Sequence, residues 1–273
     1  MPAPSVVDCV EIGGIPIALS ASDRRFLELL RRRYRGFLSA SRAEFELEFD
    51  LTPMGTVSDE DARVRRDGSD WILERGDFRA RWNPRAGKGT VRQNASPYAL
   101  DSVLRVLHSL LLAERGGFLL HAASVISSGG AYLFSGVSGA GKTTMARLAP
   151  SNVTLLTDEI SYVRPSAGRY AAFGTPFAGE LAKSGENCSA PVEALFFLEK
   201  GGENQVDELP PAEAVRRLMR NILFFAVDES LVEKLFATAF DFVERVPVRR
   251  LTFYPDARVW HEIANFQEAL DHA

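Results

Sequence analysis

The chain has 273 residues, of which 46% are hydrophobic and 25% are charged, so it can bury a sizeable core. Its formal net charge of −4 argues against nucleic acid or an anionic membrane as the main partner. Two cysteines exclude a disulfide framework. The N-terminus lacks a basic stretch followed by an apolar one, and no run of about 18 apolar residues is present, so we expect a cytoplasmic protein.

The first half of the chain predicts a mixture of helix and strand. Residues 22–34 have the apolar spacing of a helix, and Ser22 is a suitable N-cap. Residues 44–51 alternate strictly between acidic and apolar side chains, which predicts a strand with one buried face. The apolar stretches 71–73 and 78–82 flank an Arg-Gly-Asp turn and predict a hairpin.

A predicted helix connects the two halves. Ser96 can cap this helix, Pro97 suits its first position, and Gly116-Gly117 ends it. We therefore expect a smaller, mixed α+β domain over residues 1–116 and a second domain over residues 117–273.

The second half predicts strands interleaved with helices, which is typical of an α/β domain. The predicted strands are 117–126, 131–135, 153–156, 162–164, 170–173, 194–198 and 248–253, and the predicted helices are 211–225, 230–242 and 257–270.

A glycine-rich loop follows the strand that ends at Ser135. Residues 136–143 read GVSGAGKT and match G-x-x-x-x-G-K-[ST] at every fixed position, between a predicted strand and a predicted helix. Loop glycines let backbone N–H groups turn toward phosphate, and a lysine can reach the β- and γ-phosphates. The pattern predicts a site for a nucleoside triphosphate with Mg²⁺. Its nucleotide-binding residues would be Gly136, Ser138, Gly139, Ala140, Gly141, Lys142, Thr143 and Thr144.

Asp158 and Glu159 follow the predicted strand 153–156. A carboxylate at the end of a neighbouring strand is where such proteins hold Mg²⁺, together with the loop hydroxyl, here Thr143. One acid could orient the metal while the other accepts a proton from an attacking hydroxyl. His121 precedes the loop strand; on its own, a histidine beside leucines is more often a core residue than a catalytic one.

In combination, His121-Ala122, the loop 136–144 and Leu155-Leu156-Thr157-Asp158-Glu159 resemble the HPr kinase/phosphorylase family, which shares its nucleotide core with the ATP-dependent phosphoenolpyruvate carboxykinases. The resemblance covers roughly residues 117–200. It implies a P-loop core of that type and a serine kinase acting on a protein. It also implies catalytic roles for His121, Lys142, Asp158 and Glu159. The acidic pair is Asp-Glu rather than Asp-Asp, so the resemblance does not assign the base.

Residues 174–180, GTPFAGE, stand in place of the family's downstream signature and predict a loop near the nucleotide. Glu180 or Lys183 could reach the site from it. An arginine to neutralise the transferring phosphoryl group cannot be assigned, and Arg164 and Arg169 are candidates. Because HPr kinases are hexamers, a homo-oligomer is also possible.

The sequence therefore predicts a phosphotransferase whose acceptor is the hydroxyl of a protein or, as in related kinases that act on natural-product precursors, a peptide. The N-terminal domain would select that acceptor. Two alternatives stay open: a nucleotide-dependent switch that hydrolyses ATP or GTP slowly, and a carboxykinase-like enzyme for a small acid. Neither nucleic acid nor membrane is expected as a partner.

Overall fold

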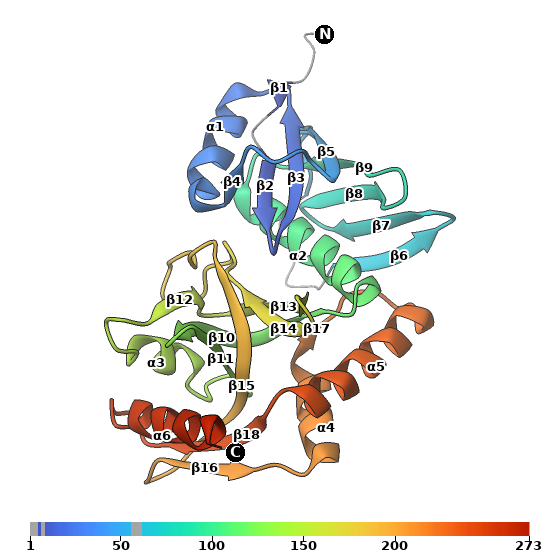
Figure 1. The fold of residues 1–273 in the computed structure, drawn as a ribbon. Coiled ribbons are helices and arrows are strands. Elements are labelled where there is room, and N and C mark those ends of the chain that lie inside the picture. The colour runs from blue at the N-terminus through green and yellow to red at the C-terminus, as the bar shows by residue number, and fades with distance from the viewer. Residues whose placement is uncertain (1–4, 7–8, 56–61, 273) are drawn as a thin grey trace. The chain divides into compact units, whose positions relative to one another are not determined.

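The computed structural model describes residues 5–6, 9–55 and 62–272. The chain is a mixed α/β protein with two sheets, each in its own compact unit (Figure 1). Unit 1 contains Met1–Leu111 and Phe224–Ser230, and unit 2 contains Leu112–Leu223 and Leu231–Ala273. In the described part of the chain, no helix is both long and apolar enough to span a membrane.

The sheet of unit 1 has the strand order β4-β2-β3-β5-β9-β8-β7-β6, with β1 beside β3. Its elements are β1 (Ser5–Val6), β2 (Cys9–Ile12), β3 (Ile15–Ala21), α1 (Arg24–Arg33), the 3₁₀ turn η1 (Arg35–Phe37), β4 (Leu38–Ser39), β5 (Phe45–Asp50), β6 (Arg63–Asp67), β7 (Asp70–Arg75), β8 (Phe78–Asn83), β9 (Lys88–Gln93) and most of α2 (Pro97–Glu114).

Local patterns fix several of these elements. Strand β5 alternates buried and exposed side chains along its whole length, as the sequence predicts. The predicted hairpin is β7–β8. The N-cap of α1 is Asp23, one residue later than predicted, because its carboxylate accepts hydrogen bonds from the N–H groups of Arg25 (2.7 Å) and Phe26 (3.1 Å). Ser22 is therefore not the cap.

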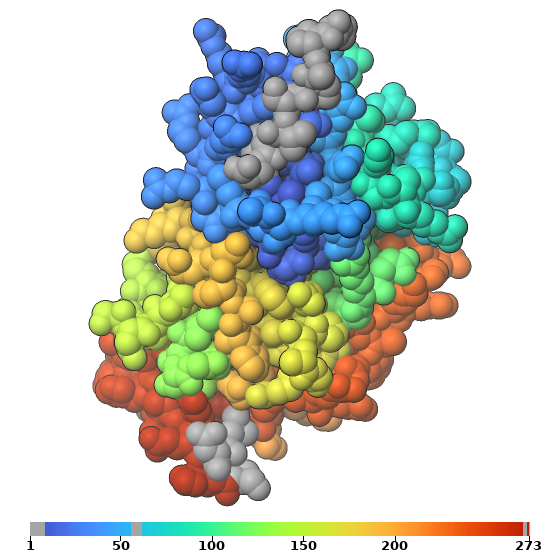
Figure 2. Space-filling model, turned by 45° about the horizontal axis from the view of Figure 1, so that its top comes forward, coloured from blue at the N-terminus to red at the C-terminus, as the bar shows by residue number. Residues whose placement is uncertain are grey.

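Unit 2 contains β10 (Phe118–Ser127), β11 (Gly130–Ser135), α3 (Lys142–Arg147), β12 (Thr154–Thr157), β13 (Ile160–Ser166), β14 (Arg169–Phe173), β15 (Ser189–Lys200), β16 (Gln205–Glu208), α4 (Pro211–Asn221), β17 (Ile222–Leu223), α5 (Glu229–Arg245), β18 (Val248–Phe253) and α6 (Val259–Asp271). The strands follow the path β11-β10-β13-β14-β15-β18-β16, while β12 and β17 also pair with β10. The atoms of β13 to β15, yellow to gold in Figure 2, form part of the surface of this unit.

Helix α4 is four residues shorter than predicted. After Asn221 the chain becomes the short strand β17, whose Ile222 and Leu223 pair with β10. Residues 224–230 then belong to unit 1, where Ala226 forms a bridge with Val64. The apolar run 222–225 looks helical in sequence, but long-range pairing decides its structure. The unit border at 111/112 also lies five residues before the boundary expected at 116/117.

Two long strands place the loops of unit 2. Residues 118–121 of β10 pair with β13, and residues 122–127 pair with β11. Strand β15 changes partner in the same way, from β14 to β11. The segments before β13 and after β11 therefore meet where β10 changes partner.

The apolar core of unit 2 holds the glycine-rich loop in place. Phe134 stacks on Phe196 (5.8 Å between ring centroids) and meets Trp260 edge to face (5.7 Å). Ala140 of the loop and Met145 of α3 belong to the same buried cluster. The loop is thus fixed at both ends by side chains that are out of water.

Candidate functional site

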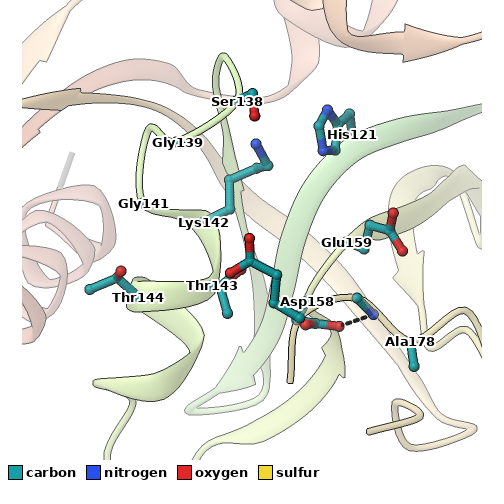
Figure 3. A pocket seen from close by; sticks show the side chains of 12 residues that line it. His121, Ser138, Gly139, Gly141, Lys142, Thr143, Thr144, Asp158, Glu159 and Ala178 are labelled. Carbon is teal, nitrogen blue, oxygen red and sulfur yellow. Dashed lines mark hydrogen bonds between the residues drawn. The ribbon is translucent and has the colours of Figure 1, made fainter. Parts of the chain in front are cut away.

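A pocket of about 540 Å³ in unit 2 gathers most of the residues predicted from the sequence (Figure 3). The glycine-rich loop and α3 form one side, and the segments before β13 and after β14 form another. The pocket is lined by His121, Ser138, Gly139, Gly141, Lys142, Thr143, Thr144, Asp158, Glu159, Ala178, Gly179 and Glu180.

The loop has the conformation that its glycines permit. Gly139 (φ +75°) and Gly141 (φ +111°) lie in the left-handed region, which other residues adopt at a cost. A Cβ on Gly141 would also lie 2.5 Å from the Phe253 ring. Gly136 and Ala140 do not line the pocket. Gly136 accepts a hydrogen bond from Lys142 instead, and Ala140 is part of the core.

Lys142 is buried at the start of α3, and its ammonium extends between Ser138 and His121 in Figure 3. It donates hydrogen bonds to the carbonyls of Gly136 (3.1 Å) and Val137 (3.3 Å). Burial lowers the pKa of Lys142, and the charges of Glu180 and Glu159 oppose that shift. The pocket therefore combines one buried cation with carboxylates that stabilise its charge.

The two neighbouring acids, Asp158 and Glu159, lie in the bend between β12 and β13. The Thr157 hydroxyl accepts hydrogen bonds from the N–H groups of Glu159 and Ile160, both at 3.2 Å. Asp158 is buried, and its two carboxylate oxygens accept from the N–H groups of Gly179 and Leu181, both at 2.8 Å. Glu159 is half-buried and also lines the pocket. Asp158 thus holds the loop that follows β14.

His121 lies on β10 at the change of partner, opposite Ile160 of β13. The N–H of the next residue, Ala122, donates to the Glu159 carbonyl (3.0 Å), and the Ser135 hydroxyl donates to the His121 carbonyl (2.9 Å). These bonds bring the histidine to both the loop and the acids. Burial, followed by the charge of Lys142, lowers the pKa of the imidazole from its usual 6.5, which favours the neutral form at pH 7.

The loop after β14 brings Glu180 to the pocket but not Lys183, which lines a neighbouring pocket. Gly179 was not singled out from the sequence. A Cβ at this position would lie 2.9 Å from both an Asp158 oxygen and the Glu159 Cβ, so the loop can approach the acids only with glycine there. The pairing of Gly179 with Asp158 has no signal in the sequence.

The two arginines considered for the transferring phosphoryl group are engaged elsewhere. The guanidinium of Arg164 lies 4.6 Å from the centre of the Phe173 ring, and Arg169 binds Glu193 at 3.1 Å. Neither lines the pocket. Three arginines of α4, at positions 216, 217 and 220, line an adjoining pocket that shares His121 and Ser138 with the first one. Sequence reasoning missed them because α4 follows the loop by 70 residues.

The pocket contains oxygen ligands of the kind that Mg²⁺ prefers. Thr143 and Glu159 offer a hydroxyl and a carboxylate in one pocket, which suits a hard cation that keeps water and phosphate ligands. Both oxygens of Asp158 accept backbone hydrogen bonds, so a cation bound there would share this carboxylate with the loop after β14. Among the described residues, no cluster of three or more His, Cys, Asp or Glu side chains could hold a metal unaided.

A family model described as "SynChlorMet cassette protein ScmC" matches residues 95–268, which is more than half of the chain. Among solved structures, the Hpr(Ser) kinase/phosphatase from Coxiella burnetii matches 56% of this chain and 93% of its own, with a TM-score of 0.34 and 9% sequence identity. None of the curated proteins matches the chain.

Proposed function

We propose that unit 2 of this chain, which belongs to the SynChlorMet cassette protein ScmC family, is an ATP-dependent kinase. It would transfer the γ-phosphoryl group of ATP to a hydroxyl of a protein or peptide, and serine is the acceptor residue that we expect. One observation carries the proposal. A glycine-rich loop that matches the phosphate-binding pattern shares one pocket, through its lysine and most of its residues, with three carboxylates and a histidine favoured in its neutral form.

The loop residues would bind the nucleotide. Backbone N–H groups at Ser138, Gly139 and Gly141 would surround the β-phosphate, and the Lys142 ammonium would exchange its two carbonyl partners for phosphate oxygens. Mg²⁺, held by the Thr143 hydroxyl, one of the two neighbouring acids and the nucleotide, would neutralise charge on the phosphates. The core of this unit would then be of the HPr kinase and carboxykinase type that the sequence resembles.

The acids and the histidine would handle the proton. The acceptor oxygen attacks the γ-phosphorus and forms the new O–P bond, while the bond from the γ-phosphorus to the bridging oxygen breaks and ADP leaves. The hydroxyl proton passes to a carboxylate or an imidazole in the pocket. Asp158 and Glu159 both line the pocket beside His121, which is favoured in its neutral form, so one acid would serve the metal while the other takes the proton.

The test uses γ-labelled ATP, Mg²⁺ and a lysate of the source cells. Wild type is compared with Lys142→Ala and Glu159→Gln, and Lys200→Ala serves as the matched control because Lys200 is exposed and lines neither pocket. We expect a labelled protein or peptide with wild type and the control only. Nucleotide binding, followed separately with a fluorescent ATP analogue, should persist in Glu159→Gln. Label released only as free phosphate would instead identify a nucleotide-dependent switch.

A further inference from the structure

A second pocket of about 580 Å³ adjoins the phosphate-binding loop. His121 and Ser138 line both pockets, so this one reaches the region between Lys142 and His121 where the γ-phosphoryl group would lie. Its opposite wall is α4. A molecule seated in it could therefore present a hydroxyl to the same histidine that faces the nucleotide.

The charge of this second pocket is positive. Its lining includes Arg216, Arg217 and Arg220 against one acid, Glu199. Arg217 is already compensated, since it binds Glu199 at 2.7 Å and Glu213 at 2.6 Å. Arg216 is exposed and lies 3.8 Å from the same Glu213. Arg220 is exposed, and within the described part of the chain it makes no hydrogen bond or ion pair.

The same pocket also offers apolar contact. Phe197 and Leu198 of β15 contribute to its lining, and Val137 at the loop is 77% exposed. A wall of arginines beside an apolar floor suits a peptide segment whose side chains are partly acidic and partly apolar. Free nucleotide phosphates would find their donors in the first pocket instead.

Resting on the kinase function proposed above, we infer that this second pocket binds the acceptor and selects a peptide segment that carries a carboxylate, Asp or Glu, beside the phosphorylated hydroxyl. Arg220, helped by Arg216, binds the carboxylate. Arg217 is the structural member of the three, because its two glutamate partners hold it against β15 and α4.

The test is an arrayed library of Ser-containing peptides in which the residues beside Ser are Glu, Gln or Lys, assayed with labelled ATP. Wild type should use Glu-flanked peptides about fivefold to tenfold better in kcat/KM than Gln-flanked ones. Arg220→Glu should remove that preference or turn it toward Lys. Lys200→Glu, the same charge change on an exposed residue next to Glu199, should keep it.

The ratio between two peptides is read from one enzyme preparation, so partial misfolding of a variant does not change it. Equal use of Glu- and Gln-flanked peptides by wild type would overturn this inference and leave the kinase function standing. An Arg220→Glu variant that slows all peptides equally would also overturn it. Bound ATP without transfer to any peptide, together with no labelled band in the lysate, would overturn both.

Discussion

One carboxylate oxygen of Asp158 lies 2.8 Å from the amide nitrogen of Gly179, 21 residues further along the chain. The other oxygen lies 2.8 Å from the amide nitrogen of Leu181. Charge-assisted bonds of this kind are about twice as strong as neutral ones. Asp158 therefore fixes the segment that brings Glu180 to the pocket, which its neighbour Glu159 also lines.

We expect the two acids to respond differently to amide substitution. Asp158→Asn loses the charge and places an NH₂ group against one backbone N–H, so the free energy of unfolding should fall by about 1–3 kcal/mol. Amide exchange at Gly179 and Leu181 should accelerate. Glu159→Gln keeps the Asp158 carboxylate and its two backbone hydrogen bonds, so amide exchange at Gly179 and Leu181 should stay as in wild type while phosphotransfer is lost. Denaturant titration and hydrogen exchange measure the difference, and equal exchange rates in the two variants would contradict this division.

Gly179→Ala should distort the pocket. The new methyl group would lie 2.9 Å from an Asp158 oxygen and from the Glu159 Cβ, closer than real contacts allow. We expect loss of nucleotide affinity, measured by titration, together with destabilisation of about 1–3 kcal/mol. Gly202→Ala is the matched control, because its Cβ would meet nothing within 4 Å and its φ is not positive. A normal affinity in Gly179→Ala would show that the loop can retreat from the acids.

The His121 imidazole should titrate below 6.5 in an NMR pH series, because burial and the charge of Lys142 both disfavour its protonated form. Since the pKa is lowered in the folded state, the stability that this group contributes is complete above the unfolded pKa. It is lost as pH falls toward the folded pKa. Phosphotransfer that needs neutral His121 should fall over the same low range.

Lys142→Met separates the two causes of that shift. It removes the cation but leaves the burial, so the His121 pKa should rise partway toward 6.5. Comparison with His121→Gln identifies the resonance. A wild-type pKa at or above 6.5 would mean that the imidazole is more hydrated than the structure places it.

In unit 1, Asp101→Ala should cost about 2–4 kcal/mol of unfolding free energy. Asp101 is buried and accepts hydrogen bonds from the Tyr34 hydroxyl and the Arg33 guanidinium, which would both lose a buried partner. Asp67→Ala breaks an exposed pair with Arg81 and should cost less than about 1 kcal/mol. Denaturant unfolding compares them, and similar costs would contradict the argument from burial.

Local signals in the sequence predict much of this molecule. The alternation in β5 and the strand, loop and helix around GVSGAGKT are visible residue by residue, because each depends on neighbours in sequence. The predicted and observed starts of α1 differ by one residue, because the N-cap is Asp23 and not Ser22. The local pattern fails at Ile222 and Leu223, where pairing with β10 replaces the predicted end of a helix.

The assembly of the site depends on contacts that no local pattern contains. His121 meets the acids because β10 exchanges β13 for β11 next to it, which is a property of the whole sheet. The helix α4 reaches the loop from far along the chain. The proposed roles of Lys142, Thr143 and the acids stay predictions until nucleotide and acceptor are measured directly.

The segment Phe224–Ser230 has a consequence for how the gene can be divided. Its Ala226 pairs with Val64 and its Asp228 lies 3.5 Å from Arg66, although residues on both sides of it belong to unit 2. A fragment starting at residue 112 would carry this segment without those neighbours, and one ending at residue 111 would lack it. A single cut in the chain therefore cannot release both units intact. Joining two fragments end to end cannot restore them either.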